Sequence, residues 1–169
     1  MKYLITTILF LLSMTASAGE ISKMFGEGVF GTKWGDTLSQ VKQTFPKGKV
    51  EKYGDIVQFV VKDGRSVLGI ERSSKATIRF GFDTESRLVG VAVYFKSDDF
   101  GNVLAKLNTH FGQPDEPKQS GYVTVQWPED ENILLMLAVI PTGFSSETAL
   151  TISNNGLNKP EVSKEELGF

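Results

Sequence analysis

Apolar residues recur at every second position along much of this chain, a spacing that places them on one face of a β-strand. Residues 76–82 follow it, and residues 88–95 carry glycine and alanine on the side opposite their valines. Residues 133–140 are apolar on both sides, as in strands that are covered on both faces. The pattern predicts a sheet in which 88–95 and 133–140 are central strands. The residues predicted to share one side of residues 88–95 are Val89, Val91, Val93 and Phe95.

Short turns join several of these strand segments. Asp63-Gly64 is a tight-turn signal that predicts a hairpin between the first two strands, and residues 83–86 predict another turn. Neighbouring strands that are joined in this way form an antiparallel sheet. The predicted strands are residues 56–61, 66–71, 76–82, 88–95, 122–127, 133–140 and 148–153.

Two segments have helical spacing instead, with apolar residues three or four positions apart. Residues 98–111 form the longer one, which begins at serine and aspartate residues able to cap its amides and ends at Gly112. Residues 36–45 form the shorter one, in which Thr37 and Gln40 have the spacing of a capping box. The predicted buried stripes are Phe100, Val103, Leu104, Leu107 and Phe111 in the longer helix and Leu38, Val41 and Phe45 in the shorter one.

The order of the segments is helix, four strands, helix, three strands. It predicts an α+β fold, in which an antiparallel sheet of about seven strands has two helices on one face. A weak duplication is also present, because residues 36–38 are similar to residues 98–100 and residues 57–59 are similar to residues 125–127. We therefore expect a tandem α-β-β-β repeat whose opposite sheet face and loops are open to a partner.

Residues 1–18 have the composition of a secretory signal peptide. A positively charged start precedes the mostly apolar residues 3–14, and Ala16-Ser17-Ala18 has the small-x-small pattern that signal peptidase cuts. Cleavage leaves 169 − 18 = 151 residues, a length typical of one domain. An uncleaved N-terminal anchor is the alternative. We expect a periplasmic or secreted protein with a single α+β domain over residues 19–158 and a polar C-terminal tail over residues 159–169.

The absence of cysteine narrows the class of exported protein. A bacterial lipoprotein needs a cysteine after the cleavage site, and small exported domains often depend on disulfides. We therefore expect a domain that is held by packing alone and has no stable membrane insertion after cleavage. A net charge of −2 with interspersed signs lacks the basic stripe that nucleic acid requires. The expected partner is another envelope or secreted protein, and not a nucleic acid.

Few residues could carry chemistry. Gly26-Glu-Gly28-Val-Phe-Gly31 and Asp99-Phe100-Gly101 mimic kinase motifs, but too few residues precede the glycines to form a strand, and no His-Arg-Asp loop lies between the motifs. His110 is the single histidine and has no partner set for a metal. Carboxylates at residues 98–99 are assigned to helix capping. Those at residues 129–131 are assigned to a solvated turn, with weak calcium binding or a glycosidase-like pair as the alternative. We predict no catalytic residue, no metal site and no cofactor.

Aromatic side chains are the remaining signal. Phe30 and Trp34 lie in a glycine-rich N-terminal segment, and Tyr122 and Trp127 lie on one late strand. One interpretation is that these residues line the core and cover the sheet. The other is a partly exposed patch that binds a partner, since aromatic residues carry much of the binding energy at interfaces. We predict these four as binding residues, with Trp34 and Trp127 as the main contacts.

The segment Gly35-Asp36-Thr37-Leu38-Ser39-Gln40-Val41 resembles the Gly-x-Thr-x-x-Gln-Val helix start of a group of small exported proteins. That group includes the small lipoprotein of the outer-membrane β-barrel assembly machine and the β-lactamase inhibitor proteins. Phe111-Gly112-Gln113-Pro114 is similar to the helix exit of the group, although here it follows the other helix. The chain departs from the group in having no lipid-bearing cysteine and no disulfide. The resemblance implies protein–protein binding through the sheet or its loops.

These observations favour a non-enzymatic exported protein that recognises another protein, such as an inhibitor, an immunity protein or an envelope-assembly accessory. The alternative is a binding protein for a small molecule, lipid or glycan, with an apolar pocket between the sheet and the helices. Residues 133–140, which are apolar on both sides, motivate this alternative. The sequence names neither the partner nor the oligomeric state.

Overall fold

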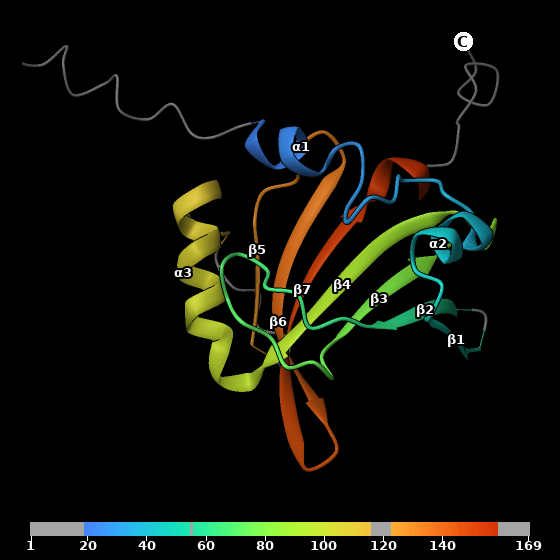
Figure 1. Ribbon diagram of the computed structural model, residues 1–169. Helices are drawn as coiled ribbons and strands as arrows, with labels where there is room; N and C mark the ends of the chain where they lie inside the picture. Colours follow the sequence, from blue (N-terminus) through green and yellow to red (C-terminus); the bar gives the residue numbers. More distant parts are fainter. Residues whose placement is uncertain (1–18, 55, 116–122, 159–169) are drawn as a thin grey trace, which may run out of the picture.

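An antiparallel sheet covered by helices forms the frame of the molecule (Figure 1). The structure, a computed structural model, describes residues 19–54, 56–115 and 123–158. Within them the strand order is β1-β2-β3-β4-β7-β6-β5. The strands are β1 Lys49–Tyr53, β2 Ile56–Lys62, β3 Thr77–Phe82, β4 Leu88–Lys96, β5 Thr124–Gln126, β6 Ile133–Thr142 and β7 Ser145–Asn154. The helices are α1 Glu20–Phe25, α2 Leu38–Thr44 and α3 Phe100–Phe111, with 3₁₀ turns at η1 Ser97–Asp99 and η2 Asn155–Asn158.

The predicted α+β fold is confirmed, and its two halves have related layouts. In each half a helix precedes a set of antiparallel strands, α2 before β1 to β4 and α3 before β5 to β7. The last strands of the two halves, β4 and β7, pair at the centre of the sheet. Residues 1–18 and 159–169, predicted as signal peptide and tail, lie outside the described residues.

The first half differs from the prediction in one strand. Residues 66–71 were expected to pair with β2, but they contain only an isolated bridge between Val67 and Ile70. Leu68 and Gly69 both have positive φ, at 56° and 71°, which interrupts an extended backbone. The Asp63 N–H instead bonds the Ala76 carbonyl, so residues 63–76 form one long connection from β2 to β3. The partner of β2 on its other side is β1, which the periodicity did not predict.

Both predicted helices are present, and their ends follow local rules. At the start of α2, the Thr37 hydroxyl accepts from the Gln40 N–H at 3.4 Å, and Gln40 Oε1 accepts from the Thr37 N–H at 2.8 Å. This is the predicted capping box. At the other helix the predicted capping by Ser97 or Asp98 is not found, because both residues lie in η1. The N-cap residues, Lys96 of η1 and Asp99 of α3, make no side-chain capping hydrogen bond. Gly112 ends α3 with φ at 77°, as predicted.

The core lies between one face of the sheet and the helices (Figure 1). Val41 of α2 and Leu107 of α3 are fully buried, in the same cluster as Phe59 and Phe80 of the sheet. The rings of Phe45 and Phe80 are 5.0 Å apart. Each such side chain contributes about 1.5–3 kcal/mol when it is fully buried. Packing of this kind replaces the disulfides that the chain cannot form.

Strand β4 is central, as predicted, but Val89 does not share the buried side of Val91, Val93 and Phe95. Gly81 pairs with Gly90, and Phe82 pairs with Leu88, so Val89 is an extra residue in a β-bulge. Leu88 is therefore fully buried and Val89 is only half-buried. A bulge of one residue reverses the alternation on one side of itself, which the periodicity in sequence cannot reveal.

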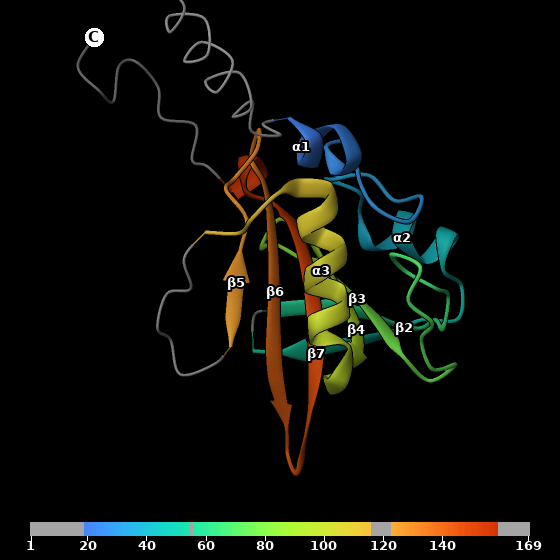
Figure 2. The same ribbon diagram turned by 90° about the vertical axis from the view of Figure 1, so that its left-hand side faces the viewer.

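The other predicted central strand is displaced from the centre. β7 lies between β4 and β6, and the other edge of β6 pairs only with the three residues of β5. Ile133, Leu135 and Leu137 of β6 face the core, while Leu134 and Met136 are half-buried on the other face. The apolar character of β6 on both sides thus extends to a sheet face that no described helix covers (Figure 2).

Candidate functional site

The hairpin of β6 and β7 projects beyond the rest of the sheet (Figure 2). Its register explains the projection, because β4 ends with the pair Lys96 and Glu147, and β5 begins opposite Ala138. Among the described strands, the last pairs of the hairpin, up to Thr142 with Ser145, pair only with each other. Gly143 has φ at 70° in the two-residue turn, which is the place for glycine in a type II′ hairpin.

An exposed aromatic residue occupies the tip of this hairpin. Phe144 has a relative exposure of 113 %, and its neighbours in the turn are small or polar. Nearer the sheet, Val123 is 58 % exposed, and Ile140 and Pro141 line a hollow of about 320 Å³ beside Thr124. We call Val123, Ile140, Pro141 and Phe144 the hairpin surface.

The outer edge of β6 disfavours the addition of a strand. The Val139 N–H donates to the Val123 carbonyl at 2.9 Å, so this edge presents its donors at alternate residues from Val139 onward. The next donor position is Pro141, which has no N–H. A partner at this edge therefore meets apolar side chains and not a complete ladder of backbone hydrogen bonds.

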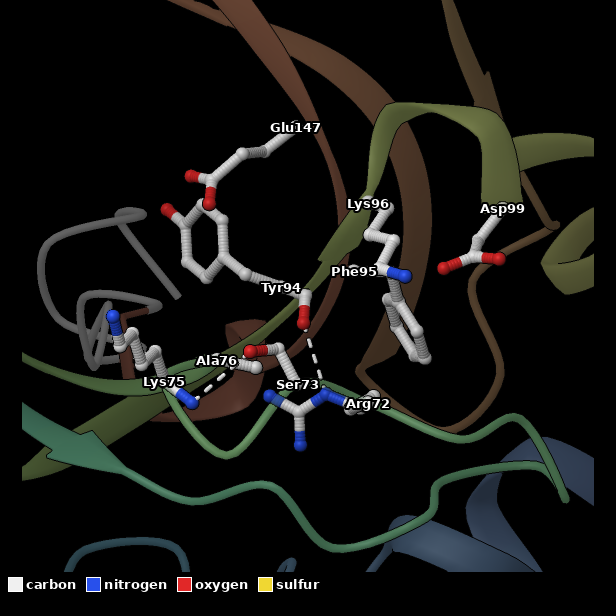
Figure 3. A pocket seen from close by; sticks show the side chains of 9 residues that line it. All are labelled: Arg72, Ser73, Lys75, Ala76, Tyr94, Phe95, Lys96, Asp99 and Glu147. Atoms are coloured by element: carbon white, nitrogen blue, oxygen red, sulfur yellow. Dashed lines mark hydrogen bonds between the residues drawn. The ribbon is translucent and has the colours of Figure 1, made fainter.

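A second hollow, of about 160 Å³, lies where the 63–76 connection meets the ends of β4 and β7 (Figure 3). We call it the charged pocket. Its polar and charged lining residues are Arg72, Ser73, Lys75, Tyr94, Lys96, Asp99 and Glu147.

Arg72 is the buried charged residue of this pocket, and its relative exposure is 8 %. Its guanidinium donates to the Tyr94 carbonyl at 2.9 Å, to the Thr77 carbonyl at 2.7 Å and to the Arg65 carbonyl at 3.4 Å. It also stacks over the Phe95 ring, with its central carbon 5.4 Å from the ring centroid. Burial lowers the pKa of Arg72, although the Asp63 charge acts against this. Arg72 therefore anchors the 63–76 connection and places a cation at the base of the pocket.

The other charged side chains stand around the mouth. Lys96 and Asp99 lie on one side in Figure 3, and Glu147 lies beside the Tyr94 ring on the other. Burial raises the pKa of the Tyr94 hydroxyl, although the Arg79 charge, whose guanidinium carbon is 5.5 Å from the ring centroid, opposes this. The charged pocket thus offers groups of both signs to one small volume.

The hairpin surface and the charged pocket are neighbours on the same end of the sheet. Lys96 on β4 pairs with Glu147 on β7, and Glu147 pairs with Ile140 on β6. Lys96 and Glu147 line the charged pocket, while Ile140 lines the apolar hollow. One row across three strands therefore connects the two.

Of the four aromatic residues predicted as binding residues, the three that the structure describes do not form one exposed patch. Trp127 is fully buried, and its indole N–H donates to the Gly112 carbonyl at 2.8 Å, so none of its surface is available to a partner. Trp34 is half-buried and donates to the Phe25 carbonyl at 2.7 Å. Phe30 packs on the core with Arg65 over its ring, at 5.3 Å from the centroid. Tyr122 lies outside the described residues.

The glycines and carboxylates that resemble catalytic motifs take part in backbone packing and in hydrogen bonds within the fold. At Gly28, a Cβ atom would clash with the Thr32 carbonyl oxygen, so this glycine permits a close backbone approach. Asp130 accepts from the Ser22 N–H at 2.8 Å, and Glu129 accepts from the Asn155 amide at 2.8 Å. His110 is exposed near the end of α3.

The described residues were also searched for metal-binding clusters and membrane-spanning helices, and the chain was compared with known proteins. Within the described residues, no group of three or more histidine, cysteine, aspartate or glutamate side chains could hold a metal ion. No described helix is both long enough and apolar enough to cross a membrane. Comparison with known proteins found no matching family model, curated protein or solved structure. The resemblance noted in the sequence therefore stays a prediction.

Sequence reasoning missed Phe144, although a signal for it exists. Thr142-Gly143-Phe144-Ser145 separates two strongly apolar or β-branched segments, and a glycine at this spacing predicts a two-residue turn. A large apolar residue in so short a turn has no core to enter, which predicts its exposure. The charged pocket has no comparable signal, because its residues come from positions 72 to 147 and meet only in the folded chain.

Proposed function

We propose that this protein is a non-enzymatic exported protein that recognises another protein through the hairpin surface. The observation that carries the proposal is the full exposure of Phe144 at the tip of a hairpin that extends beyond the sheet. An aromatic side chain that stays in water contributes no hydrophobic stabilisation to the fold. The extra length of a two-stranded hairpin adds no contact with the core. If a partner covers the exposed ring and the projecting hairpin, their apolar surface is buried and contributes to binding.

The surroundings of Phe144 support a protein partner. The short turn and the paired strands restrict the backbone, so little conformational entropy is lost when Phe144 enters a pocket on a partner. The apolar hollow beside Ile140 can in turn accept a side chain of that partner. Aromatic anchors in such positions are typical binding hot spots. An inhibitor, an immunity protein or an envelope-assembly accessory would use a surface of this kind.

A crosslinking experiment in the native cell tests the proposal. A photoreactive phenylalanine analogue replaces Phe144 in the full chain, and Met24, which is 53 % exposed on α1 near the other end of the sheet, serves as the control position. We expect one protein to be captured from position 144 and not from position 24. The same yield from both positions would contradict the proposed surface.

A binding measurement with the captured protein completes the test. We expect Phe144→Ala to weaken affinity by about tenfold or more, because an anchor of this type contributes at least about 1.4 kcal/mol. Met24→Ala is the matched control, and it should bind as the wild type does. Unchanged affinity of Phe144→Ala would overturn the proposal, provided that the wild-type complex is specific and saturable.

A further inference from the structure

We propose that the charged pocket binds a small zwitterion, a free amino acid that carries one carboxylate and one ammonium group. This second site is separate from the hairpin surface and does not depend on a protein partner. Its basis is the way in which the lining charges are arranged in the folded chain.

Among the described residues, the charged residues of the pocket form no ion pairs, which is also true of exposed lysines elsewhere, but the three arginines outside the pocket are all paired. Arg65 pairs with Asp63 and Arg79 pairs with Glu51 at 3.0 Å, while Arg87 pairs with two carboxylates. The five charged residues that line the pocket form no ion pair with one another or with any other described residue. These five residues are Arg72, Lys75, Lys96, Asp99 and Glu147.

The separation persists even where pairing would be easiest. Lys96 and Glu147 are directly opposite each other in adjacent strands, a position where unlike charges usually attract. Figure 3 shows them turned to different sides, with Lys96 toward Asp99 and Glu147 beside the Tyr94 ring. The pocket between them therefore keeps positive and negative groups that a ligand can pair.

The cationic part suits a carboxylate. A guanidinium has five N–H donors, and Arg72 uses three of them on backbone carbonyls. Arg72 is buried, whereas Lys75 and Lys96 are exposed and lie on opposite sides of it in Figure 3. An arginine that is already held in place loses little freedom when it binds an oxyanion.

The anionic part suits an ammonium group. The Glu147 carboxylate lies beside the half-buried Tyr94 ring (Figure 3). The Arg79 guanidinium already stands over this ring, 5.5 Å from its centroid, so the Glu147 carboxylate supplies the main attraction for a small cation. Asp99, on the other side of the pocket, supplies a second carboxylate.

The balance of charge distinguishes a zwitterion from a simple anion. The lining carries three cations and two carboxylates, so a phosphate dianion would meet repulsion from Asp99 and Glu147. A simple carboxylate would leave both of these acids without a partner. An amino acid pairs groups of both signs, and a hollow of about 160 Å³ limits it to a small one.

Titration by two-dimensional NMR on the full chain tests the inference. The probes are glycine, β-alanine and 4-aminobutyrate, which increase the spacing between the two charges, with acetate, butyrate and butylammonium as single-charge controls. We expect saturable shifts at the amides of Ser73, Lys75 and Lys96 for at least one zwitterion, with a dissociation constant on the order of 1 mM or tighter. The controls should bind about tenfold more weakly or not at all.

Charge-neutral variants locate the binding. Lys96→Gln and Glu147→Gln should each weaken zwitterion binding by about tenfold. The matched controls Lys106→Gln and Glu27→Gln, which remove exposed charges outside the pocket, should leave it unchanged. The inference is overturned if no zwitterion produces saturable shifts, if butyrate or butylammonium binds as well as the zwitterions, or if both pocket variants bind as tightly as the controls.

Discussion

The two ends of the sheet differ in whether their charged groups are paired within the fold. At the end that holds the turn between β3 and β4, which we call the turn end, Arg87 pairs with Asp83 at 2.8 Å and donates to the Leu157 carbonyl of η2 at 2.8 Å. Asp130 holds the start of α1 through the Ser22 N–H at the same end. At the hairpin end, the charged pocket leaves its ions apart and Phe144 stands in solvent. The turn end joins segments of the fold, whereas the hairpin end keeps groups available to other molecules.

The largest expected effect concerns an aromatic residue near the turn end. Trp127→Ala removes a fully buried indole and its hydrogen bond to Gly112, and it should destabilise the protein by about 3–5 kcal/mol. Urea unfolding measures this change. A loss below about 1 kcal/mol would show that Trp127 is not a core residue in solution, and would reopen its assignment as a contact residue.

An intermediate effect is expected at Arg72, the buried charged residue of the charged pocket. Arg72→Met keeps much of the side-chain volume but leaves the Thr77 and Tyr94 carbonyls without their guanidinium donor. We expect a loss of about 1–3 kcal/mol in unfolding free energy. Amide hydrogen exchange should become faster along residues 63–76 before other parts of the chain. Uniform acceleration across the sheet would contradict the role of Arg72 as a local anchor.

The two ion pairs Arg87–Asp83 and Arg65–Asp63 should make the stability of the protein depend on pH. At Asp83 burial opposes ionisation, but hydrogen bonds from Arg87 outweigh it and lower the pKa of Asp83. The Arg65 side chain lowers the pKa of Asp63, against the effect of burial. A carboxylate whose folded pKa is depressed stabilises the fold above its unfolded pKa of about 3.9, and this contribution disappears as the pH falls through the folded value.

Acid titration of the urea midpoint checks this prediction. We expect the stability of the wild type to fall below about pH 4, with Asp83→Asn and Asp63→Asn each showing a shallower fall. The gap between the wild type and either variant should narrow as the pH decreases. A constant gap from neutral pH to the acid limit would mean that the two aspartates act by packing and not by charge.

The smallest expected effect on stability is at the tip of the hairpin. Phe144→Ala should change the unfolding free energy by less than about 0.5 kcal/mol, because the ring has no neighbours to lose. Thermal unfolding measures this difference beside Trp127→Ala. A substantial loss at Phe144 would show that the ring is covered in solution, and would remove the observation on which the proposed function rests.

Burial explains why the aromatic residues could not be sorted from sequence. Trp34, Trp127 and Phe30 each have a plausible place either in a core or on a surface, and the composition around them does not decide. Trp127 is buried because the end of α3 at Gly112 reaches it across 15 residues of sequence. Phe144 is exposed because the strands beside its hairpin end earlier. Exposure is a property of neighbours, and neighbours are set by pairing at long range.

Local rules account for what the sequence by itself determined. The helix over residues 100–111, the capping box at Thr37 and Gln40 and most of the strands follow from periodicity and from hydrogen bonds within a few residues. Only the tertiary structure decided that β7 is central, that a bulge turns Leu88 into the core, and that the charged pocket forms. These features depend on β4 meeting β7, whose paired residues are separated by up to 63 positions, from Gly90 to Ser153. Contacts at such separation are chosen by the packing of the whole sheet, and no local pattern encodes them.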